Sequence, residues 1–132
     1  MGTYGGVYIK DEDKSFFLDG DAYPNEVIPM LQEVLKNAKT PKDASRALFD
    51  EITDSDSWIS LGADNGPQDY TYTVDIGDGT ISCILRSFEK SSSKDKINNE
   101  FEDEKKQYGN LGDIKIVETE LGTDIILYCK LF

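Results

Sequence analysis

The sequence of 132 residues contains no histidine, only two cysteines and a single tryptophan. The lack of histidine excludes a Ser-His-Asp or Cys-His catalytic couple, an imidazole proton shuttle and a zinc site of the usual His/Cys type. The chain also lacks the run of ~18 apolar residues that a membrane-spanning helix needs, and its first residues carry no secretory signal. We therefore expect no membrane contact and a cytoplasmic location.

Positive charge is scarce as well. Asp and Glu number 26 against 14 Lys and Arg, which gives a formal net charge of −12. Because nucleic acids and anionic membranes are polyanions, we expect the chain to bind neither of them directly. The two cysteines, Cys83 and Cys129, lie in apolar segments typical of strands, and we interpret them as buried reduced thiols rather than a disulfide.

The length and the 38% of hydrophobic residues are sufficient for one domain, 1–132, with a single core. The spacing of the apolar residues predicts an α+β fold in the order ββαα-ββ-α-ββ, with an antiparallel sheet of hairpins and two to three helices. The expected strands are 4–9, 15–18, 70–76, 80–88, 113–118 and 124–131. The expected helices are 25–36, 40–52 and 94–107.

The expected helices begin with capping signals. Thr40 stands before Pro41, so it is the predicted N-cap of the second helix, and Asp43 brings negative charge into its first turn. Ser93 is the predicted N-cap of the third helix, and Asn25 that of the first. These signals fix the helix starts more firmly than the apolar spacing alone.

The third expected helix carries many charges of both signs. Glu102 and Lys106 stand four residues apart, as do Lys96 and Glu100. Such pairs are typical of ordinary support on a helix surface. We therefore assign no binding role to this helix.

Carboxylates without basic neighbours are concentrated in the middle of the chain. No Lys or Arg occurs between Arg46 and Arg86, and much of the gap, at 53–68, has a composition typical of a loop anchored by Trp58, Ile59 and Leu61. Uncompensated like charges repel each other and create a negative potential that attracts a basic partner. The predicted partner-binding surface consists of the acids in this gap and the one tryptophan: Asp50, Glu51, Asp54, Asp56, Trp58, Asp64, Asp69, Asp75 and Asp78. A hydrated acidic loop without a partner is the alternative interpretation.

No catalytic constellation is recognisable. Two pairs of acids, Asp19/Asp21 and Asp54/Asp56, have a spacing that can hold a divalent cation, but neither lies in a complete calcium loop. The segment Gly77-Asp78-Gly79 joins two expected strands, so it is a turn rather than a phosphate loop. We therefore predict a non-catalytic protein with no metal site and no cofactor.

The opening Met1-Gly2-Thr3 is followed by an expected hairpin and then by Asp21-Ala22-Tyr23-Pro24 before a helix. This arrangement resembles that of small uncharacterised proteins of bacteriophages and mobile elements, which open with MGTR and carry a motif such as HWDGYP. The chain departs from that pattern, because Asp19-Gly20 replaces the His-Trp pair and Tyr4 replaces the arginine. The resemblance covers the first half and implies a phage or prophage accessory gene.

Three functions fit these observations. The first is a phage-encoded inhibitor of a host defence or nucleic-acid-binding protein, of the anti-CRISPR or anti-restriction type, whose carboxylates mimic the phosphates of nucleic acid. The second is a module that sequesters or cleaves a signalling nucleotide, motivated by tyrosine-rich strands and opposed by the scarcity of arginine. The third is an immunity protein against a basic toxin, which has the same mechanism as the first.

Overall fold

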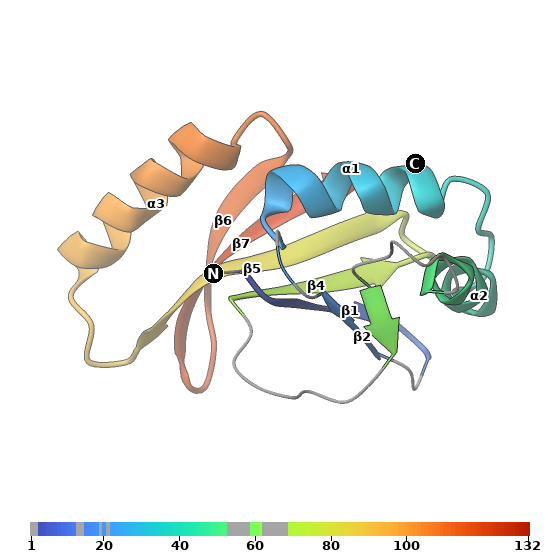
Figure 1. Cartoon of the computed structure of the whole chain (residues 1–132). Coiled ribbons are helices and arrows are strands. Elements are labelled where there is room, and N and C mark those ends of the chain that lie inside the picture. The colour runs from blue at the N-terminus through green and yellow to red at the C-terminus, as the bar shows by residue number, and fades with distance from the viewer. Residues whose placement is uncertain (1–2, 13–14, 19, 21, 53–58, 62–68) are drawn as a thin grey trace.

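The computed structural model describes residues 3–12, 15–18, 20, 22–52, 59–61 and 69–132. Its helices and strands follow one another in the order ββαα-βββ-α-ββ and form one α+β domain (Figure 1). The strands are β1 (Gly5–Ile9), β2 (Ser15–Leu18), β3 (Ile59–Leu61), β4 (Tyr70–Asp75), β5 (Thr80–Glu89), β6 (Asp113–Glu118) and β7 (Gly122–Lys130). The helices are α1 (Pro24–Val34), α2 (Pro41–Ile52) and α3 (Lys94–Tyr108). None of these three is long and apolar enough to cross a membrane.

The strands of the described chain form one sheet in the order β3-β2-β1-β4-β5-β7-β6. The α+β class and the helices are as predicted, but the expectation of a wholly antiparallel sheet is wrong at one pairing. β1 and β4 run parallel, with Val7 opposite Tyr72, whereas the other neighbours are antiparallel. The physical reason is the long connection through α1, α2 and β3, because only a crossover of this kind returns the chain in a parallel direction.

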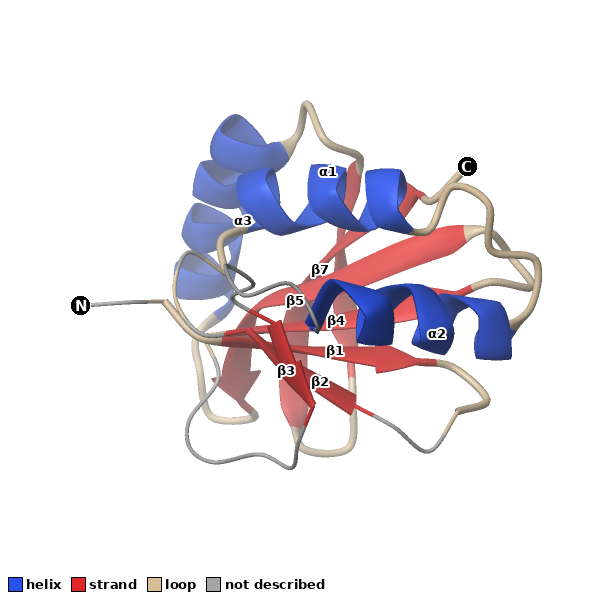
Figure 2. Ribbon diagram, turned by 45° about the vertical axis from the view of Figure 1, so that its right-hand side comes forward, coloured by secondary structure: helices blue, strands red, loops and turns tan. Residues whose placement is uncertain are grey.

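All three helices lie on the same face of the sheet (Figure 2). Alternate strand residues point toward them and are buried, among them Val7, Tyr72 and Leu127. The hydroxyl of Tyr72 donates a hydrogen bond of 2.6 Å to the carbonyl oxygen of Ala22, so the segment before α1 is fixed to the middle of the sheet. The core therefore lies between one sheet face and one layer of helices, and no helix of the described part of the chain lies on the other face.

Two of the three predicted helix caps are confirmed. Thr40 Oγ1 accepts a hydrogen bond of 3.1 Å from the backbone N–H of Asp43, and Ser93 Oγ accepts one of 3.2 Å from Lys96. The prediction for Asn25 is wrong, because α1 begins earlier, with Tyr23 as N-cap and no side-chain cap bond. Proline is favourable in the first turn of a helix, where it lacks only an N–H that has no partner there, so Pro24 explains the earlier start.

The segment predicted as a loop, 53–68, contains one strand. Residues 59–61 form β3, which pairs antiparallel with β2 at the edge of the sheet. A run of three residues is too short for an alternating pattern to be recognised, and its partner is distant in the sequence. The prediction of free, buried cysteines is confirmed for Cys83 and Cys129.

Candidate functional site

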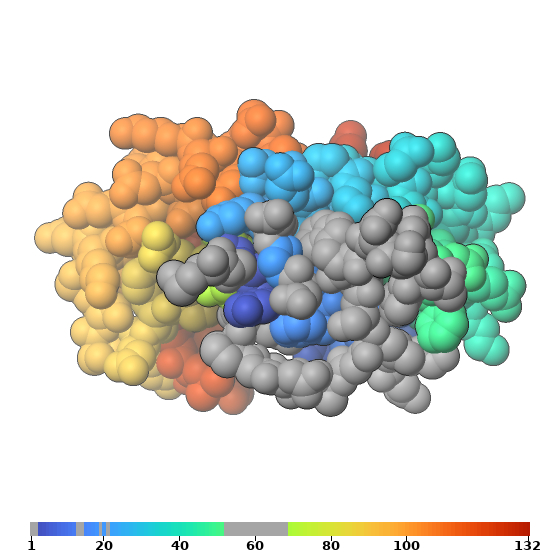
Figure 3. Space-filling model, viewed as in Figure 1, coloured from blue at the N-terminus to red at the C-terminus, as the bar shows by residue number. Residues whose placement is uncertain are grey.

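Helix α2 carries the first two residues of the predicted binding surface. Two side chains stabilise the start of this helix. Thr40 is its N-cap, and Asp43 Oδ2 accepts a hydrogen bond of 3.2 Å from the N–H of Lys39. Ala44 and Leu48 are fully buried in the core and fix the helix to the sheet. Figure 3 shows α2 at one end of the molecule and α3 at the opposite end.

The C-terminal end of α2 is acidic and exposed. Asp50 and Glu51 are both exposed, and the last turn of the helix contains no basic residue. The negative end of the helix dipole lies at this terminus, so each carboxylate there costs about 0.3–1 kcal/mol of stability in an exposed position. We name Asp50 and Glu51 the acidic end of α2. Their placement is unfavourable for folding and favourable for the attraction of a basic partner.

An exposed aromatic ring lies directly before these acids. Phe49 has 44% of its surface exposed, although large aromatic side chains are normally covered. It borders a hollow of about 330 Å³ on the side of α2. Ser45 lies in the same wall, and its Oγ is buried without a hydrogen-bond partner in the described part of the chain. The described residues that line the hollow are Glu12, Lys42, Ser45, Arg46 and Phe49.

The remaining described acids of the predicted surface separate into two groups along β4. Asp69 comes before the strand, and its Oδ2 accepts a hydrogen bond of 3.0 Å from the N–H of Tyr4. Asp75 ends the strand and Asp78 lies in the following turn. A strand of six residues spans about 20 Å, so Asp69 and Asp75 do not share a patch. Asp54, Asp56, Trp58 and Asp64 lie outside the described residues.

Asp75 has a structural role in the hairpin. Its Oδ1 accepts a hydrogen bond of 3.0 Å from the backbone N–H of Asp78, and its Oδ2 lies 3.3 Å from Nζ of Lys10. The hydrogen bond from Asp78 and the charge of Lys10 lower the pKa of the Asp75 carboxyl, and the carboxylate raises the pKa of Lys10. This acid therefore stabilises the turn and the adjacent β1, and it is not free to bind a partner.

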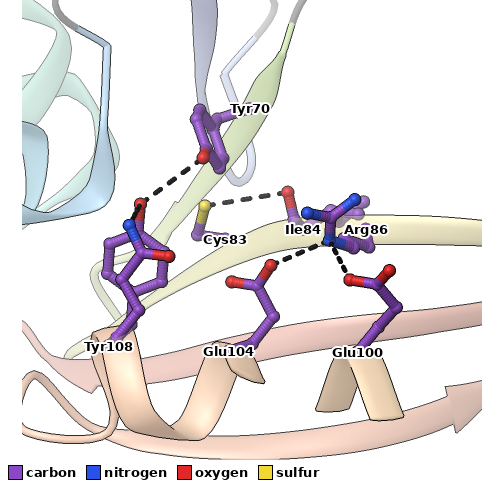
Figure 4. Close-up of polar contacts among 8 residues, drawn as sticks. Tyr70, Cys83, Ile84, Arg86, Glu100, Glu104 and Tyr108 are labelled. Atoms are coloured by element: carbon purple, nitrogen blue, oxygen red, sulfur yellow. Dashed lines mark hydrogen bonds and ion pairs between the residues drawn. The ribbon is translucent and has the colours of Figure 1, made fainter. Parts of the chain in front are cut away.

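A second cluster of polar groups lies between β5 and α3 (Figure 4). Arg86 Nε is 2.9 Å from Glu104 Oε1 and 3.2 Å from Glu100 Oε2. The side chain of Glu104 is only 8% exposed, so Arg86 neutralises a carboxylate that burial would otherwise disfavour. The hydrogen bond that Arg86 donates to Glu104 raises the pKa of Arg86.

The tyrosines and the thiol beside this cluster are not activated for chemistry. The hydroxyl oxygens of Tyr70 and Tyr108 are 3.5 Å apart, and burial raises the pKa of both groups. Burial also raises the pKa of the Cys83 thiol, which keeps it protonated and unreactive at neutral pH. Among the residues that the structure describes, no group of three or more His, Cys, Asp or Glu side chains is placed to hold a metal ion. The pairs Asp19/Asp21 and Asp54/Asp56 lie outside those residues.

Sequence reasoning missed two features of these sites. Phe49 directly follows Leu48 of the buried stripe, so its position on the edge of that stripe was the available signal. Arg86 pairs across 14 and 18 residues with Glu100 and Glu104, which no local spacing rule predicts. The sequence predicted ion pairs between Glu102 and Lys106 and between Lys96 and Glu100. In the structure Glu102 instead pairs with Lys105, at 3.2 Å, and Glu100 pairs with Arg86.

The chain was compared with family models, curated proteins and solved structures, and none of these comparisons found a match.

Proposed function

We propose that this protein is a non-catalytic binding protein that presents the acidic end of α2 to a basic protein surface, as a phage-encoded inhibitor of a host defence or nucleic-acid-binding protein does. The observation that carries the proposal is the placement of Asp50 and Glu51 against the helix dipole. Two further acids, Asp54 and Asp56, follow within the next five residues of the sequence. Selection for stability alone disfavours this concentration of charge at a helix C-terminus.

In this mechanism the carboxylates take the place of nucleic-acid phosphates. Asp and Glu form charge-assisted hydrogen bonds with the Lys and Arg side chains that normally bind phosphate. Phe49 supplies the apolar contact, because partly exposed aromatic residues that become buried contribute much of the binding energy of an interface. The raised pKa values of Tyr70, Tyr108 and Cys83 make these three groups poor nucleophiles at neutral pH.

The experiment is capture from a bacterial lysate with three immobilised proteins. They are the wild type, a variant with Asp50→Lys and Glu51→Lys, and a control variant with Glu118→Lys and Glu120→Lys. Both variants change the net charge equally at exposed positions, but the control changes lie at the end of β6 and in the turn that follows. Quantitative mass spectrometry compares the captured proteins at low and high salt.

We expect the wild type and the control to capture the same basic proteins and to release them at high salt. The α2 variant is expected to capture about ten times less of these proteins, or still less. Equal capture by all three proteins overturns it. A captured nuclease or toxin, in place of a nucleic-acid-binding defence protein, changes the biological role to immunity without changing the surface.

A second candidate function is the binding of a signalling nucleotide, and the hollow beside Phe49 favours it. Lys42 and Arg46 supply positive charge for a phosphate, and the Phe49 ring supplies a surface on which a base can stack. Thermal-shift measurements with cyclic nucleotides, with and without magnesium, test this function directly. A rise in Tm that Arg46→Ala removes supports it, and the lack of a shift with every nucleotide contradicts it.

A further inference from the structure

None of the three described helices covers the second face of the sheet, and the strand register shows which side chains of the described strands point toward that face. Because successive residues of a strand point to opposite sides, the residues between the buried ones point away from the helices. Paired neighbours across the sheet agree with this assignment, for example Thr73 beside Tyr8 and Ser82, and Ile84 beside Ile126. We name this surface the open sheet face. Its central members are Tyr8, Phe17, Thr71, Thr73, Ser82, Ile84, Ile126 and Tyr128.

The charge on the open sheet face is very different from that of the whole chain. Its central members are uncharged, and the charged residues lie at the strand ends and on the edge strand β6. Among the described residues of this face, three bases stand against five acids, which gives a net charge of −2, compared with −12 for the chain. These charged residues are Lys10, Lys115 and Lys130, and Asp69, Asp75, Glu89, Asp113 and Asp124. An uncharged centre with aromatic residues and a charged rim is the usual anatomy of a protein interface.

The size of the face also fits an interface. The seven strands contain three to ten residues and are therefore about 10–33 Å long; at a spacing of about 4.8 Å they cover a flat area of roughly 650–700 Å². The accessible surface of a face with protruding side chains is larger than its flat area, and a standard interface buries about 800 Å² per partner. Tyr8, with 43% of its surface exposed, protrudes from the face. A hollow of about 260 Å³ offers room for an inserted polar side chain, and its described lining is Asp69, Thr71, Ile84, Leu85, Arg86 and Ser87.

From these observations we propose that the open sheet face binds a second copy of this chain, giving a two-fold symmetric dimer with its sheets stacked and its helices outside. A nearly neutral face does not attract a basic partner. Two such faces can bury each other without bringing many like charges into contact. Sheets that stack face to face lie about 10 Å apart, with strands about 30° from alignment, and this places the acidic end of each α2 on the outer side of the dimer. The proposal is independent of the proposed function.

The test is the mass of the protein in solution, measured by sedimentation and by light scattering between about 1 and 100 μM, where interfaces of this size typically associate. The wild type is expected at twice the 14.8 kDa of one chain. Ile84→Lys and Thr73→Lys place a charge in the centre of the face and are expected to raise the dimer Kd about a hundredfold, since a desolvated unpaired charge is costly. Leu121→Lys is the control, because Leu121 is 90% exposed in the turn between β6 and β7.

Circular dichroism and the denaturation midpoint identify any variant that does not fold, and Thr73→Lys decides the test if Ile84→Lys unfolds. Raising the salt concentration is expected to strengthen the dimer, because screening weakens the repulsion between two chains of charge −12. A monomeric wild type at 100 μM overturns the proposal. So does a dimer that both central lysines leave unchanged, or one that Leu121→Lys weakens equally.

Discussion

Helices α2 and α3 lie at opposite ends of the molecule and are both rich in charge, but they use it differently (Figure 3). α3 follows the helix dipole, with Asp95 in its first turn and Lys105 and Lys106 in its last. Its buried Glu104 is neutralised by Arg86 from the sheet. α2 has a favourable start at Asp43, but its last turn has two acids and no base.

The comparison distinguishes charge that stabilises the fold from charge that does not. In α3 the ion pairs and the dipole account for most of the charged residues, so no further role is needed to explain them. At the acidic end of α2 the helix dipole disfavours the two carboxylates, and the last turn contains no base to offset them. The difference therefore makes the α2 terminus the better candidate for a binding surface, although α2 has three acids and α3 has five.

The largest expected effect concerns Arg86. Arg86→Ala leaves Glu104 buried without its partner, and we expect the free energy of unfolding to fall by about 1–3 kcal/mol, less than for a fully buried pair because Arg86 is half exposed. Chemical denaturation measures the difference. Lys105→Ala breaks an exposed pair with Glu102 and is expected to cost less than about 1 kcal/mol. Equal losses in the two variants would show that the β5–α3 cluster adds no stability.

The N-terminal caps are expected to contribute equally in the two helices. Thr40→Ala and Ser93→Ala each remove one side-chain hydrogen bond to a backbone N–H, at a cost of about 1 kcal/mol. The denaturation midpoints of both variants test this, with the exposed Ser91→Ala as control. A loss in only one helix would mean that the two differ at their starts as well as at their ends.

The C-terminal ends are expected to respond with opposite signs. Asp50→Asn with Glu51→Gln removes unfavourable charge and raises the free energy of unfolding by about 0.3–1 kcal/mol per residue at low salt. Lys105→Gln with Lys106→Gln lowers the free energy of unfolding by a similar amount, because these positive charges interact favourably with the negative end of the α3 dipole. A destabilised Asp50/Glu51 variant would contradict the comparison.

The smallest expected effect is the acid dependence from Asp75. Its pKa is lowered in the folded state, so it binds fewer protons there than in the unfolded chain. Its contribution to stability is therefore present above the unfolded pKa, near 3.8, and is lost as the pH falls through the lower folded value. Asp75→Asn is expected to flatten the fall in stability below about pH 4, measured by denaturation at several pH values. An unchanged acid profile would exclude this carboxylate as the source.

Local features of the fold were predictable from the sequence. The caps at Thr40 and Ser93 and the hairpin of β4 and β5 depend on residues close together in the chain, and the structure confirms them. The parallel pairing of β1 with β4 and the short β3 were not predicted. Both depend on contacts between segments distant in the sequence, about which alternation within one segment carries no information.

The candidate site was predictable only in part. The absence of bases after Arg46 drew attention to Asp50 and Glu51, and the structure places both of them exposed and adjacent on α2. The same count included Asp69 and Asp75, which the two ends of β4 separate and which hold backbone groups or Lys10. Net charge along a sequence does not show which acids have partners, because those partners come from other strands.

The most direct test of the central claim measures stability and capture in the same pair of proteins. The wild type and the Asp50→Asn, Glu51→Gln variant are compared by chemical denaturation and by capture of basic proteins at low salt. We expect the variant to be more stable by about 0.6–2 kcal/mol in total and to capture markedly less. A variant that gains stability and captures the same proteins in the same amounts would contradict the assignment of this helix end as the binding surface.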